Sequence, residues 1–205
     1  LWERLNHNPL LYLRQVGRSE INAKAQDPIY LDQYDRVFAE FDAYLKTKDT
    51  WFSRQYKNAN KKVLAYFSME FAIHQALKVY SGGLGFLSGS HMRSAYDLRQ
   101  NVVGVGILWS FGYYDQGRNE DRTLKVEFTR KYYYFLEELA PRVAVVINGK
   151  TVIVKGYLLR PGVFGTAPII FLSTDTDEND FLSRTITHKL YDANERTRVA
   201  QEIVL

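Results

Sequence analysis

The chain has 205 residues, of which 46% are hydrophobic and 24% charged, as in a globular protein with a substantial core. It contains no cysteine, which excludes disulfides, thiolate zinc sites and a cysteine nucleophile. The net charge of +4 is spread along the chain, and no apolar run is long enough to span a membrane. We therefore expect a cytoplasmic protein with neither a nucleic-acid partner nor a membrane.

Residues 1–60 predict a helical N-terminal extension. Asn8-Pro9 and Asp27-Pro28 each combine a helix-capping side chain with a proline at the first helical position. Apolar residues recur with helical spacing from Ile29 to Leu45, so we expect a helix over 28–46. The polar stretch 57–62 is predicted to link this extension to a second domain, 61–205.

The second domain is predicted to open with a strand, a glycine loop, a helix and a second strand. The apolar runs 63–69 and 102–108 are typical of parallel strands buried on both faces. A helical pattern lies between them and indicates a packing face made of Leu84, Leu87, His91, Ala95 and Leu98, with Gly89 as an irregularity. This βαβ order predicts an α/β fold, in which ligands bind beyond the carboxyl ends of the strands.

The remaining sequence adds further strands and a last helix. Residues 142–159 predict a β-hairpin with a type I′ turn at Asn148-Gly149, which we expect to be an insertion. Strands are also expected over 123–128 and 168–172, and a helix from Asn194. The acidic stretch 175–180 does not have the spacing of a calcium loop, so we expect it to be solvated.

The glycine loop, Tyr80 to Gly85, holds the first candidate site. Three glycines follow a strand and precede a helix, so backbone N–H groups can approach a phosphate or a sugar hydroxyl. The loop matches neither the Walker motif nor GxGxxG, and a tight turn without a ligand explains the same spacing.

The flanking residues make this loop more specific. The run from Tyr66 to Leu98, YFSMEFAIHQALKVYSGGLGFLSGSHMRSAYDL, resembles the α-glucan phosphorylase family of glycogen, starch and maltodextrin phosphorylases. The similarity is greatest to its shorter bacterial and archaeal branch. It continues through 103–108 and 112–116 and returns in ERTRVAQEIVL, residues 195–205.

This resemblance implies the N-terminal, Rossmann-like portion of a GT-B glycosyltransferase. It implies reversible phosphorolysis of α-1,4-glucan or maltodextrin by inorganic phosphate, which releases glucose 1-phosphate. It also implies pyridoxal phosphate, bound by a lysine of a C-terminal domain that the chain lacks. We therefore expect this chain to be a fragment that carries no catalytic residue and is inactive alone. The sequence leaves the oligomeric state open, with a homo-oligomer among the alternatives.

The resemblance also transfers site residues. It implies that Gly82, Gly83, Leu84 and Gly85 bind the glucosyl and phosphate groups. Glu70, His74 and Tyr80 border the loop, and we expect them to support the site by packing or hydrogen bonding. His91 is expected only to pack within the helix.

Two alternatives stay open, one from departures from the family pattern and one from the glycine loop itself. Ala72 and Arg99 occupy positions where the family usually has glycine, Ser90 replaces an acidic residue, and Ser110-Phe111 replaces a more polar pair. One alternative is a non-catalytic glucan-binding or regulatory relative. The other is a glycogen or starch synthase-like glycosyltransferase, which also carries a GGLG loop.

Overall fold

The computed structural model describes residues 1–58 and 61–205, and it divides the chain into two compact units, Leu1–Lys48 and Asp49–Leu205. Part of the expected 57–62 linker thus lies outside the described residues. The helix α4 (Trp51–Gln55) is grouped with the second unit, because the Thr50 hydroxyl donates to the carbonyl oxygen of Leu98 at 2.7 Å.

The first unit is entirely helical. It contains a 3₁₀ turn η1 (Glu3–Leu5) and the helices α1 (Pro9–Gln15), α2 (Arg18–Lys24) and α3 (Pro28–Lys46). Both start signals are confirmed, since Asn8 accepts from the N–H of Leu11 and Asp27 accepts from the N–H groups of Ile29 and Tyr30. The predicted bounds of α3 are confirmed as well.

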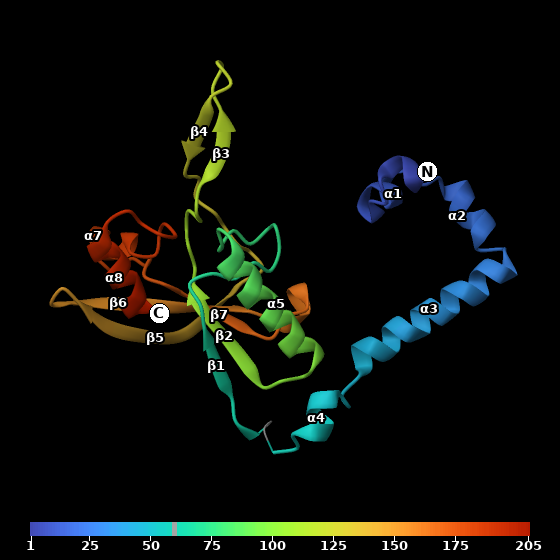
Figure 1. The fold of residues 1–205 in the computed structure, drawn as a ribbon, viewed down its shortest axis with the longest axis horizontal. Coiled ribbons are helices and arrows are strands. Elements are labelled where there is room, and N and C mark those ends of the chain that lie inside the picture. The colour runs from blue at the N-terminus through green and yellow to red at the C-terminus, as the bar shows by residue number, and fades with distance from the viewer. Residues whose placement is uncertain (59–60) are drawn as a thin grey trace. The chain divides into compact units, whose positions relative to one another are not determined.

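The second unit is built on a five-stranded mixed sheet, shown in Figure 1. Its order is β1 (Leu64–Phe67), β2 (Val102–Ile107), β7 (Ile169–Ser173), β6 (Lys150–Leu159) and β5 (Glu137–Ile147). The first three strands are parallel, whereas β6 pairs antiparallel with both β7 and β5. The expected α/β architecture is confirmed at this level.

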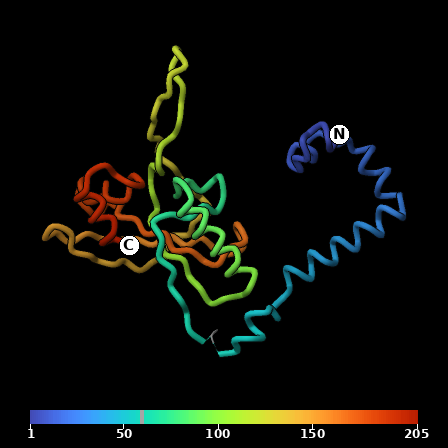
Figure 2. Tube along the Cα trace, in the orientation of Figure 1, coloured from blue at the N-terminus to red at the C-terminus, as the bar shows by residue number. Residues whose placement is uncertain are grey.

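The β5–β6 hairpin was expected to be an insertion, and that expectation is wrong. The hairpin forms two strands of the main sheet, because β6 continues the hydrogen bonding from β7. Its turn is as predicted, with φ of 52° at Asn148 and 76° at Gly149. A separate hairpin, β3 (Asp115–Arg118) with β4 (Leu124–Glu127), projects from this unit in Figures 1 and 2.

The expected βαβ order is present, with α5 (Gly83–Asp97) between β1 and β2, but the predicted face of α5 is confirmed only at Ala95 and is wrong at its first residues. Leu84 and Leu87 are exposed, and the buried residues are Gly85, Ser88, Gly89, Met92 and Ala95. A Cβ at Gly89 would lie 2.2 Å from the carbonyl oxygen of Ala72. Apart from Met92, the buried face therefore consists of small residues, because the helix approaches a neighbouring backbone closely.

The prediction that β1 is buried on both faces is also wrong for this chain. Leu64 and Phe67 are 63% and 57% exposed. The physical reason is its place in the sheet: β1 is an edge strand that pairs only with β2 among the described residues. The strand β2, by contrast, is largely buried as predicted.

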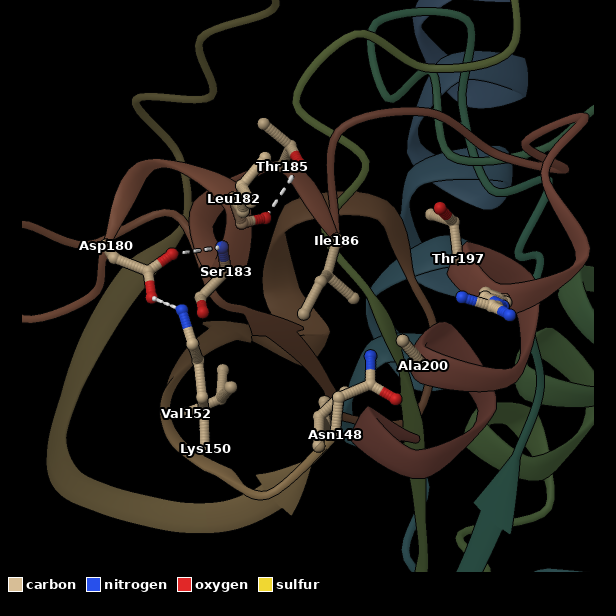
Figure 3. A pocket seen from close by; sticks show the side chains of 12 residues that line it. Asn148, Lys150, Val152, Asp180, Leu182, Ser183, Thr185, Ile186, Thr197 and Ala200 are labelled. Carbon is tan, nitrogen blue, oxygen red and sulfur yellow. Dashed lines mark hydrogen bonds and ion pairs between the residues drawn. The ribbon is translucent and has the colours of Figure 1, made fainter.

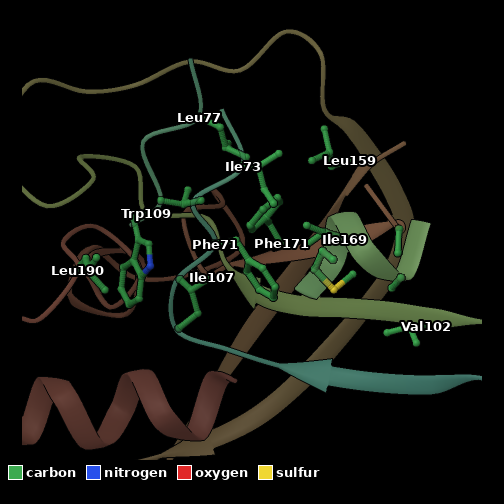
Figure 4. Packing of buried hydrophobic residues seen from close by; sticks show 14 residues of the cluster. Phe71, Ile73, Leu77, Val102, Ile107, Trp109, Leu159, Ile169, Phe171 and Leu190 are labelled. Carbon is green, nitrogen blue, oxygen red and sulfur yellow. The ribbon is translucent and has the colours of Figure 1, made fainter. Parts of the chain in front are cut away.

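The main core lies against the sheet and supports the segment between β1 and α5. Figure 4 shows Phe71 and Phe171 within this cluster, with ring centroids 6.1 Å apart. Trp109 is fully buried, and its indole N–H donates to the carbonyl oxygen of Met69 at 2.9 Å. The segments that follow β1 and β2 are thereby fixed to each other. The short helices α6 (Pro161–Phe164) and α7 (Phe181–Thr185) and the terminal helix α8 (Glu195–Val204) complete the unit.

Candidate functional site

Three parallel strands end at the same edge of the sheet, and polar segments follow each of them. Glu70 and the glycine loop follow β1, residues 109–114 follow β2, and Asp175 follows β7. Ligands of open α/β sheets bind beyond this edge. The structure thus places the predicted loop where that general rule expects a site.

The glycine loop supplies unpaired backbone donors at the start of α5. Gly82 is the N-cap, and Gly83, Leu84 and Gly85 are the first three helical residues. The first N–H groups of a helix have no partner within the helix. Among the described residues, the N–H groups of Gly83, Leu84 and Gly85 have no acceptor.

The glycines of the loop serve two different purposes. A Cβ at Gly82 or Gly83 would meet nothing within 4 Å, so these positions face open space. A Cβ at Gly85 would lie 2.6 Å from Tyr80 Cβ and 3.0 Å from Glu70 Oε2. Gly85 is therefore required for packing, whereas Gly82 and Gly83 leave room for a ligand.

Glu70 holds the loop in place. Its carboxylate accepts from the N–H of Ser81 at 2.7 Å, from the N–H of Gly82 at 3.2 Å and from the Ser81 hydroxyl at 3.2 Å. It also accepts from the hydroxyl of Tyr191. Glu70 is only 2% exposed, so burial raises its pKa, but these hydrogen bonds outweigh burial and lower the pKa below its ordinary value.

The two other predicted bordering residues have different surroundings. Tyr80 packs edge-on against Phe86 of α5, with ring centroids 5.6 Å apart. His74 stacks on Phe164 of α6 at 4.5 Å, and its Nδ1 accepts from the N–H of Ala76. His91 contacts the ring of Tyr66 at 4.8 Å. His74 and His91 therefore both take part in packing, and neither hydrogen-bonds to the glycine loop.

A pocket of about 190 Å³ lies beside the loop. Its lining includes Tyr80, Ser81, Tyr113, Tyr114 and Lys131. Lys131 is mostly buried, and its ammonium group forms an ion pair with Asp115. Sequence reasoning missed Lys131, because only the fold brings it from residue 131 to this edge.

The acidic stretch after β7 was expected to be solvated, and for Asp175 this is wrong. Its side chain is 4% exposed and forms ion pairs with Arg130 and Arg184, and the imidazole of His188 lies 3.4 Å from its carboxylate. Burial raises the pKa of Asp175, but hydrogen bonds from Arg184 and Arg130 lower it more. For His188, burial lowers the pKa and outweighs the opposing effect of Asp175. Two cationic side chains thus neutralise a buried carboxylate next to the site.

A second pocket, of about 270 Å³, lies at the β5–β6 turn and is shown in Figure 3. Two of its charged groups bind each other. Lys150 Nζ lies 3.2 Å from Asp180 Oδ2, while Asp180 Oδ1 accepts from the N–H of Ser183 and caps α7. Lys150 and Asp180 therefore already have structural roles.

The departures from the family pattern lie around α5. Ser90 is exposed on the helix. Arg99 has a φ of 56°, the left-handed conformation that favours glycine, and its guanidinium lies over the Tyr96 ring. The Ala72 N–H donates to the carbonyl oxygen of Gly85 at 2.8 Å. These three residues lie outside the glycine loop, so the departures leave its backbone N–H donors in place.

The described residues hold neither a metal-binding cluster nor a membrane-spanning helix. They contain no group of three or more His, Cys, Asp or Glu side chains arranged to hold a metal ion. Within the same residues, no helix is long and apolar enough to cross a membrane.

Comparisons with known proteins give the chain's relatives. Residues 1–77 match a family described as "Protein of unknown function (DUF3417)". An uncharacterized protein of Methanocaldococcus jannaschii is 62% identical over 144 residues, which are 70% of this chain and 28% of that protein.

Two named enzymes align with the whole chain. A glycogen phosphorylase of Mycobacterium tuberculosis is 31% identical over 220 residues, 25% of its length. A maltodextrin phosphorylase of Thermococcus litoralis is 29% identical over 220 residues, 26% of its length. The chain therefore spans about a quarter of the length of the relatives it matches.

Proposed function

Because this chain is homologous over its full length to glycogen and maltodextrin phosphorylases, as an N-terminal portion of that family, we propose that the full-length protein is an α-glucan phosphorylase. The proposed reaction transfers the terminal glucosyl unit of an α-1,4-glucan to inorganic phosphate and releases glucose 1-phosphate. In this proposal the chain forms one side of the site within a two-domain GT-B fold, and it is inactive alone.

The observation that carries the proposal is the set of free donors at the start of α5. The N–H groups of Gly83, Leu84 and Gly85 lie at the positive end of a 15-residue helix, beside open space at Gly82 and Gly83. Such donors stabilise an anion without carrying a proton that must be removed. We assign these residues to the phosphate and glucosyl groups.

Glu70 is proposed to position the loop rather than to transfer a proton. Its carboxylate accepts four hydrogen bonds, and its pKa is below the ordinary value, so it stays ionised at neutral pH. An ionised, fully engaged carboxylate is a poor general acid. Tyr80 supports the same loop by packing, and His74 supports the segment that leads to it.

The family's cofactor, pyridoxal phosphate, supplies a phosphate group for proton transfer when it is bound. We place its lysine on polypeptide beyond this chain. Lys131 lines the pocket beside the loop, and its ammonium group forms an ion pair with Asp115, so we assign it a structural role. The proposed partners are therefore an α-glucan, phosphate and the C-terminal domain of the same protein. We propose a cytoplasmic homo-oligomer.

The proposal is tested with the full-length protein. Incubation with maltodextrin, inorganic phosphate and pyridoxal phosphate should release glucose 1-phosphate. If the protein binds the cofactor and maltodextrin but releases no glucose 1-phosphate, the non-catalytic alternative suggested by Ala72, Ser90 and Arg99 replaces it. Transfer from a nucleotide sugar instead of phosphorolysis would identify the synthase-like alternative.

A further inference from the structure

The hydroxyl of Tyr191 reaches the carboxylate that holds the glycine loop. Glu70 Oε2 is occupied by the N–H groups of Ser81 and Gly82, and Oε1 accepts from the Ser81 hydroxyl and from Tyr191. Tyr191 lies 121 residues further along the chain, so this bond connects two distant segments. It is the tertiary contact by which the segment before α8 meets the loop's carboxylate.

The backbone at Tyr191 is held in an unusual conformation. Its φ is 56°, in the left-handed region that a bulky side chain rarely adopts. Such a conformation persists only where surrounding contacts fix it. Leu190 supplies one of them, since it is 2% exposed and its N–H donates to the carbonyl oxygen of Gly112 at 3.0 Å.

The ring of Tyr191 also faces the pocket segment that follows β2. It lies edge-on to Tyr113, with centroids 6.5 Å apart, and Tyr113 lines the pocket beside the loop. The residue thus connects the segment after β2, the loop after β1 and the start of α8. Burial and the bond to Glu70 raise the pKa of Tyr191 to about 12, so it remains a hydrogen-bond donor at neutral pH.

From this geometry we propose that Tyr191 is a positioning residue, whose hydrogen bond to Glu70 sets the glycine loop in the geometry that receives phosphate. The identity of the ligand as phosphate rests on the proposed phosphorylase function, whereas the coupling between Tyr191 and the glycine loop does not. Tyr191 orients the Glu70 carboxylate, and the carboxylate orients the N–H groups of Ser81 and Gly82. The free donors of Gly83, Leu84 and Gly85 follow directly in the chain.

A first experiment measures the coupling without any turnover. Hydrogen exchange of the two loop amides that donate to Glu70, those of Ser81 and Gly82, is compared between the full-length protein and its Tyr191→Phe variant. We expect exchange of these amides to rise about tenfold, as for a local opening that lost one hydrogen bond to a charged group, with β2 unchanged. Glu70→Gln should show a larger rise in the same amides. Unchanged exchange in Tyr191→Phe would overturn the proposal.

A second experiment measures the consequence for the ligand. In Tyr191→Phe the KM for inorganic phosphate should rise about tenfold and by more than the KM for maltodextrin, because an anion depends on the loop's N–H donors more than a neutral sugar does, and the melting temperature should fall by only a few degrees. Tyr134→Phe is the matched control, because Tyr134 is 95% exposed and should change none of these quantities. Equal changes in both KM values would show a general structural role and would also overturn the proposal. If the wild-type protein itself releases no glucose 1-phosphate, the proposed function fails, and hydrogen exchange still decides the coupling.

Discussion

Substituting Gly89 by alanine tests the close approach of α5 to the segment after β1. The added Cβ would lie 2.2 Å from the carbonyl oxygen of Ala72 and 2.8 Å from its carbonyl carbon. Both contacts are with backbone, so no side-chain rotation relieves them. The helix must move away, and this disturbs the hydrogen bond from the Ala72 N–H to the Gly85 carbonyl oxygen.

The size of the effect follows from two opposing contributions. Overpacking a well-packed interior costs roughly 1–3 kcal/mol, and a backbone contact this short belongs at the upper end, about 3 kcal/mol. Alanine is favoured over glycine within a helix by about 1 kcal/mol. The net destabilisation is therefore about 2 kcal/mol, or a fall in melting temperature of roughly 4–8 °C for a domain of this size.

Urea and thermal unfolding of Gly89→Ala measure this loss, and Gly162→Ala is the matched control. Gly162 lies in the helix α6, and a Cβ there would meet nothing within 4 Å. The control should be as stable as the wild type or slightly more stable. A Gly89→Ala protein that is more stable than the wild type by about 1 kcal/mol would refute the close approach, because helix propensity alone would then account for the result.

Three further predictions follow from the buried charges and tyrosines. Glu70→Gln should destabilise the protein by roughly 1.5–3 kcal/mol, since hydrogen bonds to a charged acceptor are lost. In the wild type the pKa of Glu70 is lowered, so its contribution to the free energy of unfolding is present above the ordinary value of 4.5 and is lost as the pH falls through the lowered value. Urea unfolding from pH 6 to 3 would detect this loss. Asp175→Asn should lower the free energy of unfolding in urea by about 1.5–2 kcal/mol. This is the lower part of the range for hydrogen bonds to charged groups, because Arg184 is 36% exposed and its ion pair is partly screened. Unchanged stability would show that the ion pairs of Asp175 contribute nothing. Burial raises the pKa of Tyr133 to about 12, so stability should fall as the pH rises from 10 towards 12, and Tyr133→Phe should weaken that dependence; an identical alkaline profile in the variant would contradict this assignment.

Features encoded by neighbouring residues could be predicted from the sequence. The caps at Asn8 and Asp27 and the turn at Asn148-Gly149 each depend on two or three adjacent residues, and the structure has all of them. The order of strand, glycine loop, helix and strand was predictable for the same reason, because hydrophobic periodicity and glycine position are local signals.

Features that depend on tertiary approach could not be predicted. Gly89 disturbs the apolar pattern of α5, yet it marks the face that packs against Ala72. The exposure of β1 depends on which strands lie beside it, and an apolar run cannot show this.

The same limit applies to the candidate site. Gly82 and Gly83 could be identified from their spacing, and Glu70 from its position after the strand. Nothing in the sequence showed that Tyr191 completes the hydrogen bonds of Glu70, or that Asp175 is buried between two arginines. The assignment of the loop to phosphate and glucosyl groups therefore stays a prediction.

The most direct test of the central claim follows phosphorus through the reaction. Full-length protein loaded with pyridoxal phosphate is incubated with maltodextrin and inorganic phosphate and observed by ³¹P NMR. The account predicts that the inorganic phosphate signal declines while a glucose 1-phosphate signal grows by the same amount, and that this conversion requires maltodextrin. Shortening of maltodextrin with an unchanged phosphate signal, or no change in either one, would contradict it.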